Sequence, residues 1–223
     1  MAIKFEHYAR KYRHARLERR DGILQVTLHS EGRELLWGMG PHEELSHLFG
    51  DIARDAENRV VILTGTGEAF CANPPGAASG TLPPSSWDPV YSDGKYLLMN
   101  HLSVEVPLIA AVNGPALRHA ELAVLCDIVL ASENASFQDS AHFPNGVVPG
   151  DGVHVVWPLI LGPNRGRYFL LTGQELSARE ALALGVVNEV LPRERLMPRA
   201  WELARQIAAR PALAVRYARV CLT

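Results

Sequence analysis

Four short apolar segments along the chain predict buried β-strands. Residues 22–28 alternate between apolar and polar side chains, as does a strand with one buried face. The segments 60–65 (VVILTG), 107–112 (PLIAAV) and 126–131 (CDIVLA) are almost continuously apolar. Such runs are typical of parallel strands that are covered on both faces.

Other segments carry the signals of helices. Apolar residues at helical spacing predict a helix over residues 42–54 and two further helices over 198–209 and 211–222. A capping box at residues 177–180 (SARE) marks the start of another helix, which we expect to stop near Gly185. Strands that alternate with helices imply an α/β fold with a mainly parallel sheet.

The segment from Cys71 to Ser92 is rich in proline, glycine and serine. This composition predicts a long loop, and long loops in compact domains are usually functional or mobile. We expect residues 72–92 to line a substrate pocket.

Composition and charge narrow the classes of function. The chain has 223 residues, 48% hydrophobic and 21% charged, enough for one large domain, or one domain with an appendage, around a sizeable core. A net charge of −2 without a basic run argues against nucleic acid or a membrane surface as a partner. Cys71, Cys126 and Cys221 are scattered and lack zinc-ligand spacing, which fits a reducing cytoplasm. Residues 1–20 are too charged for a signal peptide, and every apolar run is too short to span a bilayer.

Two loops that follow buried strands contain the residues whose side chains could take part in catalysis. In a parallel sheet, ligands bind at the carboxyl ends of the strands. Residues 139–152 (DSAHFPNGVVPGDG) place His142 and Asp151 on one loop that could fold back and bring them together. A carboxylate that orients an imidazole suits general-base chemistry, and the chain has no serine or cysteine in a nucleophile-elbow motif, so water would be the nucleophile. The alternative is a hydrogen bond that only stabilises the loop.

The second loop, residues 113–121 (NGPALRHAE), supplies His119. His119 is a second candidate, and the alternative is a partly exposed histidine in the first turn of a helix. Trp37 could present its indole N–H to a carbonyl oxygen, or it could simply pack in the core. Glu121 is most simply a first-turn carboxylate favoured by the helix dipole.

The two loops, in this order, resemble the crotonase (enoyl-CoA hydratase/isomerase) superfamily. The resemblance also rests on residues 60–70 (VVILTGTGEAF), 127–132 (DIVLAS) and 172–191 (TGQELSAREALALGVVNEVL), so that it covers nearly the whole chain. It implies a spiral of repeated ββα units with C-terminal helices, assembled as a homotrimer or as a hexamer made of two trimers.

The chain departs from this superfamily at the site that defines it. Typical members hold a thioester enolate with two backbone N–H groups. Pro74 falls at or beside the first donor, and proline has no N–H to give. Residues 118–120 (RHA) stand where a glycine run is expected for the second. Both changes argue against a CoA-thioester mechanism, since the loss of one such donor costs a few kcal/mol of transition-state stabilisation.

The pattern instead resembles 6-oxocamphor hydrolase and the related β-diketone hydrolases, a side branch of the superfamily. The matching stretches are residues 36–37, the His119 turn, 142–144, 148–158 and 164–176. The resemblance implies hydrolysis of the carbon–carbon bond between two carbonyls, with His142 and Asp151 as a water-activating dyad. His119 and Trp37 would bind or polarise the carbonyls of the diketone substrate. No metal and no organic cofactor are expected, because the second carbonyl takes up the electrons of the breaking bond.

The end of the chain is a further departure. The relatives continue into C-terminal helices that build the trimer and supply an acidic residue near the active site. We therefore expect a crotonase-like core over residues 1–195, and the start of a helical trimerisation region over 196–223 that is truncated or has lost its tail. Two other functions stay open: a CoA-thioester hydratase, isomerase or hydrolase of the same fold, and a catalytically idle scaffold subunit.

Overall fold

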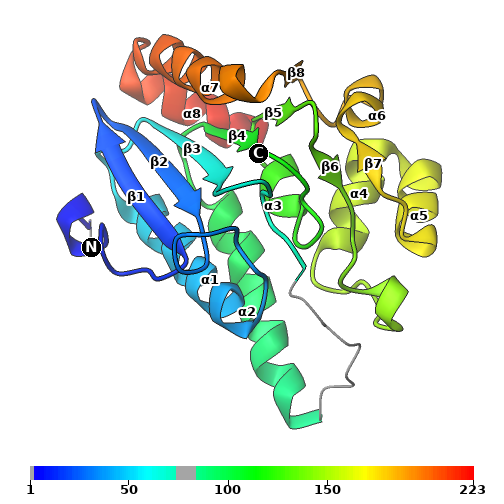
Figure 1. Cartoon of the computed structure of the whole chain (residues 1–223). Helices are drawn as coiled ribbons and strands as arrows, with labels where there is room; N and C mark the ends of the chain where they lie inside the picture. Colours follow the sequence, from blue (N-terminus) through cyan, green and yellow to red (C-terminus); the bar gives the residue numbers. More distant parts are fainter. Residues whose placement is uncertain (1–2, 74–83) are drawn as a thin grey trace.

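The centre of the molecule is a six-stranded sheet. The computed structural model describes residues 3–73 and 84–223 (Figure 1). The strand order is β1-β2-β3-β4-β5-β8. The strands are β1 (Ala15–Arg20), β2 (Ile23–Leu28), β3 (Val60–Gly65), β4 (Leu108–Val112), β5 (Ile128–Ser132) and β8 (Glu189–Leu191). The predicted strands therefore exist, each within two residues of its expected bounds.

All neighbouring strands of this sheet run parallel except β1 and β2. These two form a hairpin, with Arg20 opposite Ile23. Asp21 and Gly22 both have positive φ, 51° and 77°, as two-residue hairpin turns require. β1 was not predicted, because its charged residues alternate on an exposed edge and give little apolar signal.

The helices also follow the predicted segments. The long helices are α1 (Met39–Arg54), α2 (Pro84–Leu102), α7 (Arg193–Ala208) and α8 (Ala212–Leu222). The shorter elements are η1 (Phe5–His7), α3 (Glu121–Val124), η2 (Phe143–Asn145), α4 (Val153–Leu161), α5 (Pro163–Thr172), α6 (Ala178–Ala183) and the small strands β6 (Ser136–Phe137) and β7 (Leu176–Ser177). The capping box at Ser177 and Glu180 starts α6, and Gly185 follows its end with a φ of 76°.

The prediction of a continuous loop to Ser92 is wrong for its last nine residues. Residues 84–92 form the first turns of α2. Pro84 occupies the first helical position, where an N–H is not needed, and Pro89 removes a single backbone hydrogen bond from the second turn. The later turns of α2 pack on α1, where Asn100 donates to Ser46 O and His101 contacts Phe49, and residues 84–92 extend the same helix with mostly exposed side chains. Residues 74–83 lie outside the described residues.

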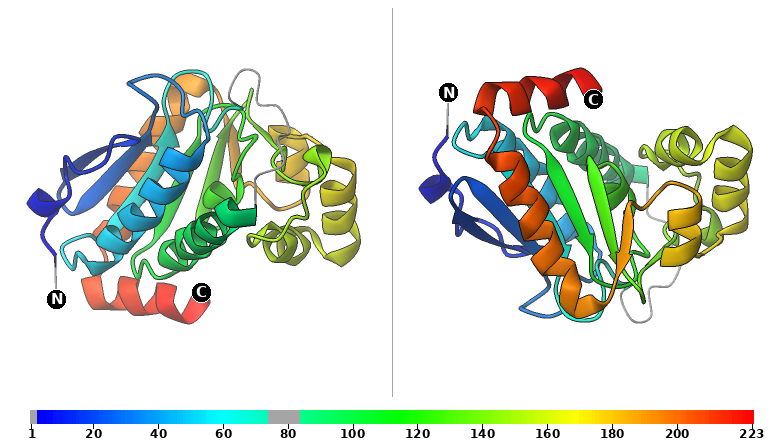
Figure 2. Two further views of the ribbon diagram at one scale, coloured as in Figure 1. Left: turned by 90° about the horizontal axis from the view of Figure 1, so that it is seen from below. Right: turned by 90° about the horizontal axis from the view of Figure 1, so that it is seen from above.

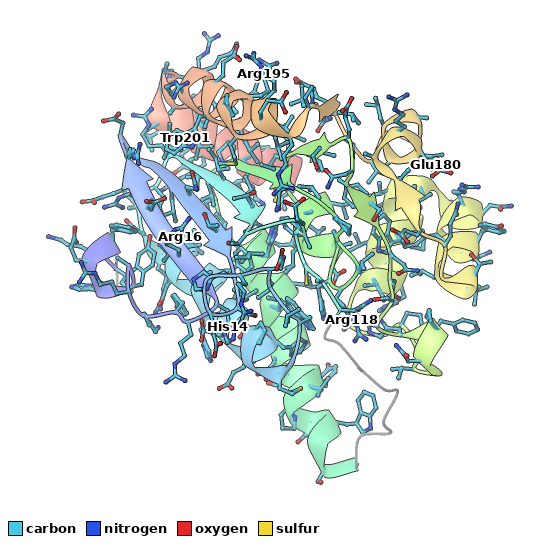
Figure 3. The ribbon with its side chains drawn as sticks, viewed as in Figure 1. His14, Arg16, Arg118, Glu180, Arg195 and Trp201 are labelled. Carbon is cyan, nitrogen blue, oxygen red and sulfur yellow. The ribbon has the colours of Figure 1, made fainter. Side chains whose placement is uncertain are left out.

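Helices cover both faces of the sheet (Figure 2). On one face, α7 packs Leu196, Ala200 and Ala204 against a cluster that includes Ile62 and Ile109. Trp201 of α7 also donates a hydrogen bond to the Gln25 side chain of β2, 2.9 Å away (Figure 3). The larger core lies on the other face, under α1, α2 and α3, and extends to α4 and α5. This second face carries the side chains of the candidate site.

The expected boundary at residues 195 and 196 falls inside α7, which packs on the sheet. The division into a core and a trimerisation region stays a prediction. Among the described residues, no helix is both long enough and apolar enough to cross a membrane.

Candidate active site

Side chains from three separate segments meet at the carboxyl ends of the strands. Trp37 precedes α1 and His42 lies in its first turn. His119 comes from the turn between β4 and α3, and Glu121 is the first residue of α3. The long loop between β6 and α4 brings Asp139, His142 and Asp151.

His142 lies between two carboxylates. Its Nδ1 is 2.8 Å from Asp139 Oδ1, and its Nε2 is 3.2 Å from Asp151 Oδ2. Burial by itself would lower the pKa of His142, but the hydrogen bonds to the two carboxylates outweigh it and raise the pKa to about 10. His142 is therefore an imidazolium at neutral pH and a strong base when it loses its proton.

Asp151 connects the two histidines of the site. Its Oδ2 is 3.2 Å from His142 Nε2 and 3.9 Å from His119 Nε2. Burial would raise the pKa of this carboxyl, but the hydrogen bond to His142 and the charge of His119 hold it well below its usual range. Among the described residues, no group hydrogen-bonds to the buried Oδ1 of Asp151. This buried oxygen is therefore an acceptor without a donor in the described part of the chain.

His119 is buried and paired with Glu121. Its Nδ1 is 2.5 Å from Glu121 Oε1. Burial would lower the pKa of His119, but the charge of Glu121 and its hydrogen bond raise it. The ring of Trp37 stacks on His119 with centroids 4.1 Å apart, a contact that also favours a cationic imidazole. His119 is therefore buried and not a partly exposed histidine of a first helical turn. Glu121 pairs with His119, so its position is not explained by the helix dipole alone.

The backbone of His119 is left-handed, with φ of 47°. Glycine adopts this conformation freely, whereas other residues do so at a cost of about 1–2 kcal/mol. A glycine run is expected at residues 118–120 in the superfamily. The turn thus keeps a glycine-like conformation at His119 while it adds an imidazole to the site.

His42 completes the cluster. Its ring centroid is 5.3 Å from that of His119 and 6.0 Å from that of Trp37. Burial lowers the pKa of His42 to about 4, and the positive charge of His119 adds to this effect. His42 is therefore a neutral ring at physiological pH.

Arg118 joins the two regions in which the superfamily places its backbone donors. Its side chain extends from the loop after β4 (Figure 3), and its Nε donates to Asn73 Oδ1 at 2.8 Å. Ser140 Oγ donates to the same oxygen at 2.9 Å. Pro74, the expected defect at the first donor, lies outside the described residues.

A pocket of about 400 Å³ opens beside this cluster. One wall is α2 and the other is the loop that leads to α4. The lining is mostly apolar and ends at His142 and Asp151. Its lining residues are Trp87, Val90, Tyr91, Lys95, Leu98, Met99, His142, Val147, Val148, Gly150, Asp151 and Gly152. A few polar groups at one end of an apolar pocket are typical of a small-molecule site.

Three side chains of the buried cluster have the spacing of metal ligands. His119, Glu121 and Asp151 each offer one ligand atom, and these atoms lie within 4.8 Å of one another. A metal needs the lone pair of a neutral imidazole, whereas the raised pKa of His119 favours the protonated ring. The cluster is better suited to proton transfer than to a cation.

The structure brings together all four residues predicted for the site: Trp37, His119, His142 and Asp151. Sequence reasoning missed the roles of Asp139, Glu121 and His42 as their neighbours. Asp139 precedes His142 by three residues, a short spacing that could have suggested the pair. His42 precedes Leu45 by three residues, on the buried face of the predicted helix, and this pattern could have marked it as a buried histidine.

The chain belongs to the enoyl-CoA hydratase/isomerase family, whose sequence profile matches residues 18–222. The structure is similar to a β-diketone hydrolase from the cyanobacterium Anabaena sp. PCC 7120 bound to (S)-3-oxocyclohexyl acetic acid. The identity is 50% and the TM-score 0.92, over 97% of this chain and 87% of that one. An enoyl-CoA hydratase from Bacillus anthracis has 29% identity and a TM-score of 0.84, over 94% of this chain and 82% of that one. Carnitinyl-CoA dehydratase from Shigella flexneri is 33% identical over 203 residues, which are 89% of this chain and 76% of that protein.

These similarities confirm the predicted crotonase-like α/β fold and the resemblance to a β-diketone hydrolase. The chain is a crotonase-superfamily enzyme. Its relatives include both a hydrolase of diketones and enzymes named for CoA thioesters, so the reaction itself must be argued from the site.

Proposed function

We propose that this enzyme hydrolyses a β-diketone by cleaving the carbon–carbon bond between its two carbonyls. The observation that carries the proposal is the continuous chain of paired side chains Asp139–His142–Asp151–His119–Glu121 beside the apolar pocket. The 50% identity to a protein described as a β-diketone hydrolase supports the same reaction. That protein binds an oxo acid, and an oxo acid is what water leaves when it opens a cyclic diketone in this way.

Water activation falls to His142 and Asp151. Asp139 is a positioning residue that fixes His142 Nδ1 as a donor, so that Nε2 faces Asp151 and the pocket. The nucleophilic water would reach Nε2 from the pocket, which both His142 and Asp151 line. Because the pKa of His142 is about 10, the neutral ring is scarce at pH 7, and we expect the rate to rise with pH towards that value.

His119 serves as the electrophile. As a protonated ring held by Glu121, it donates its Nε2–H to the carbonyl oxygen that water attacks. The indole of Trp37 packs on His119 and presents its N–H to the second carbonyl. Side-chain donors of this kind supply the oxyanion stabilisation that other members of the superfamily obtain from backbone N–H groups.

The proposed reaction balances without any further reagent. His142 takes one proton from water, and the resulting hydroxide adds to the first carbonyl carbon to form an alkoxide. The alkoxide collapses to a carboxylic acid, and the bond to the central carbon breaks with its electron pair. The second carbonyl accepts these electrons as an enolate, which then takes the proton from His142. One water is consumed, and the product of a cyclic substrate is an oxo acid.

A panel of cyclic 1,3-diketones tests the proposal directly. Loss of the ultraviolet absorbance of the diketone should accompany the appearance of an oxo acid, detected by NMR or mass spectrometry, with no CoA present. Crotonyl-CoA and carnitinyl-CoA serve as parallel substrates. Turnover of a CoA thioester without any diketone cleavage would support the second candidate, which the carnitinyl-CoA dehydratases at about a third identity favour. Turnover of neither class would support an idle scaffold.

A further inference from the structure

One ridge of α2 faces the pocket with a single charge on it. Trp87, Tyr91, Lys95 and Met99 follow one another at four-residue intervals, and all four line the pocket. Side chains at this spacing stand in a row along a helix. Three of them are large and apolar or aromatic, so Lys95 is the one charged residue of this row.

Among the residues that the structure describes, none offers a carboxylate partner to Lys95. It takes part in none of the ion pairs formed by the residues that the structure describes. Its neighbour Gly94 is buried close to the catalytic end of the pocket, where a Cβ atom would lie 3.5 Å from Asp151 Cβ and 3.4 Å from His42 Nε2. The backbone of α2 at Gly94 therefore lies close to Asp151 and His42, and Lys95, the next residue, lines the pocket.

The attacked carbonyl would become a carboxylate within a cluster that already holds the carboxyl groups of Asp139, Asp151 and Glu121. A carboxylate formed beside Asp151 would be destabilised there unless a cation offsets their charge. Of the described residues that line the pocket, Lys95 is the one with a lysine or arginine cation.

We propose that Lys95 binds a carboxylate inside this pocket, so that the site takes oxo carboxylates as ligands. The inference rests on the proposed function, because hydrolysis of a diketone creates such a group. The carboxylate comes either from the product or from a substrate that carries one already.

Equilibrium binding tests the inference without turnover. The probes are 5-oxohexanoate, the oxo acid that cyclohexane-1,3-dione would give, and its uncharged amide 5-oxohexanamide, measured by calorimetry. Lys95→Met should weaken binding of the carboxylate by about tenfold and leave the amide unchanged, since a hydrogen bond to a charged group contributes about 1.5 kcal/mol or more. Lys95→Arg should retain the charge effect, and Lys4→Met, a change at an exposed lysine far from α2 in the sequence, is the matched control.

The outcomes separate the two proposals. Equal losses for carboxylate and amide in Lys95→Met, or no loss for either, would overturn the anchoring role. A selective loss in a protein that cleaves no diketone would keep the carboxylate site and reject the proposed reaction. Kinetics then identify the source: a raised KM only for 3,5-dioxocyclohexane carboxylate indicates a substrate carboxylate. Weaker product inhibition during hydrolysis of cyclohexane-1,3-dione indicates a product carboxylate.

Discussion

The protein buries four histidines, and they divide into two pairs. His119 and His142 each contact a carboxylate, and the pKa of each is raised. Burial lowers the pKa of His42 to about 4 and that of His101 to about 3, with a further contribution from the positive charge of His119 and of Arg219, respectively. All four rings are nearly inaccessible to solvent. The carboxylates, and not the degree of burial, decide which histidines carry a proton and can act on a substrate.

The surroundings of His101 make the contrast clear. His101 lies in α2 with its ring centroid 4.7 Å from that of Phe49, and its Nε2 is 3.7 Å from the thiol of Cys126. These neighbours offer packing and one weak hydrogen bond. At His142, the same type of side chain is held by charged groups on both ring nitrogens. We therefore expect a catalytic role for His142 and only a structural role for His101.

Replacement of Asp151, which pairs with His142, should cause the largest loss of activity. Asp151→Asn deprives His142 of one of its two anionic partners. We expect the fold to persist and kcat to fall by about 10²–10⁴. Circular dichroism checks the fold, and Asp88→Asn, on the exposed part of α2, is a matched control. Near-normal turnover in a correctly folded Asp151→Asn protein would exclude the dyad.

Removal of the His119 ring tests the second histidine that is paired with a carboxylate. His119→Ala removes the proposed donor to the carbonyl, so both substrate binding and rate should suffer. We expect kcat/KM to fall by about 10²–10³, which is typical of the loss of one oxyanion donor. Steady-state kinetics with the best diketone measure it, and unchanged constants would remove His119 from the site.

Replacement of Asp139 tests how far the carboxylates raise the pKa of His142. In Asp139→Asn, His142 keeps only one carboxylate, so its pKa should fall from about 10 by more than one unit. NMR titration of the His142 ring measures the change. The rising limb of the kcat/KM profile should shift to lower pH by the same amount. A profile that stays in place would mean that His142 is not the group that limits the rate.

The two neutral buried histidines, His42 and His101, should make the protein less stable in acid. A buried histidine with a lowered pKa opposes folding once the unfolded chain takes up protons, so stability should fall as pH drops from 6.5 towards 4. His42 and His101 should each cost about 2 kcal/mol between pH 6.5 and 4.5. Urea unfolding at the two pH values measures the loss, and His42→Gln should remove part of it. His142 acts in the opposite direction, since its stabilising charge is lost as pH rises from 6.5 through 10.

The smallest expected effect concerns the backbone at His119. His119→Gly and His119→Ala both delete the ring, but only glycine relieves the positive φ of 47°. We expect the glycine variant to be more stable than the alanine variant by about 1 kcal/mol. Equal stability in urea unfolding would show that the left-handed conformation carries no cost at this turn.

The sequence by itself determined most of the fold. Continuous apolar runs at residues 60–65 and 107–112 have few solutions other than buried parallel strands, and the capping box at Ser177 fixed the start of α6. The candidate residues His119, His142 and Asp151 could also be selected, because they stand in loops that follow such strands. Local composition misled at residues 84–92, which continue a helix whose later turns pack on α1.

Only the tertiary structure decided the charge of each histidine. Sequence spacing cannot show that Asp139 and Asp151 reach opposite nitrogens of His142, or that Glu121 turns back to His119. Equally, nothing local to His42 indicates that it faces a cationic ring without a carboxylate of its own. A pKa depends on which charges lie within a few ångströms and on how much water is excluded, and both are set by segments that are far apart in the chain.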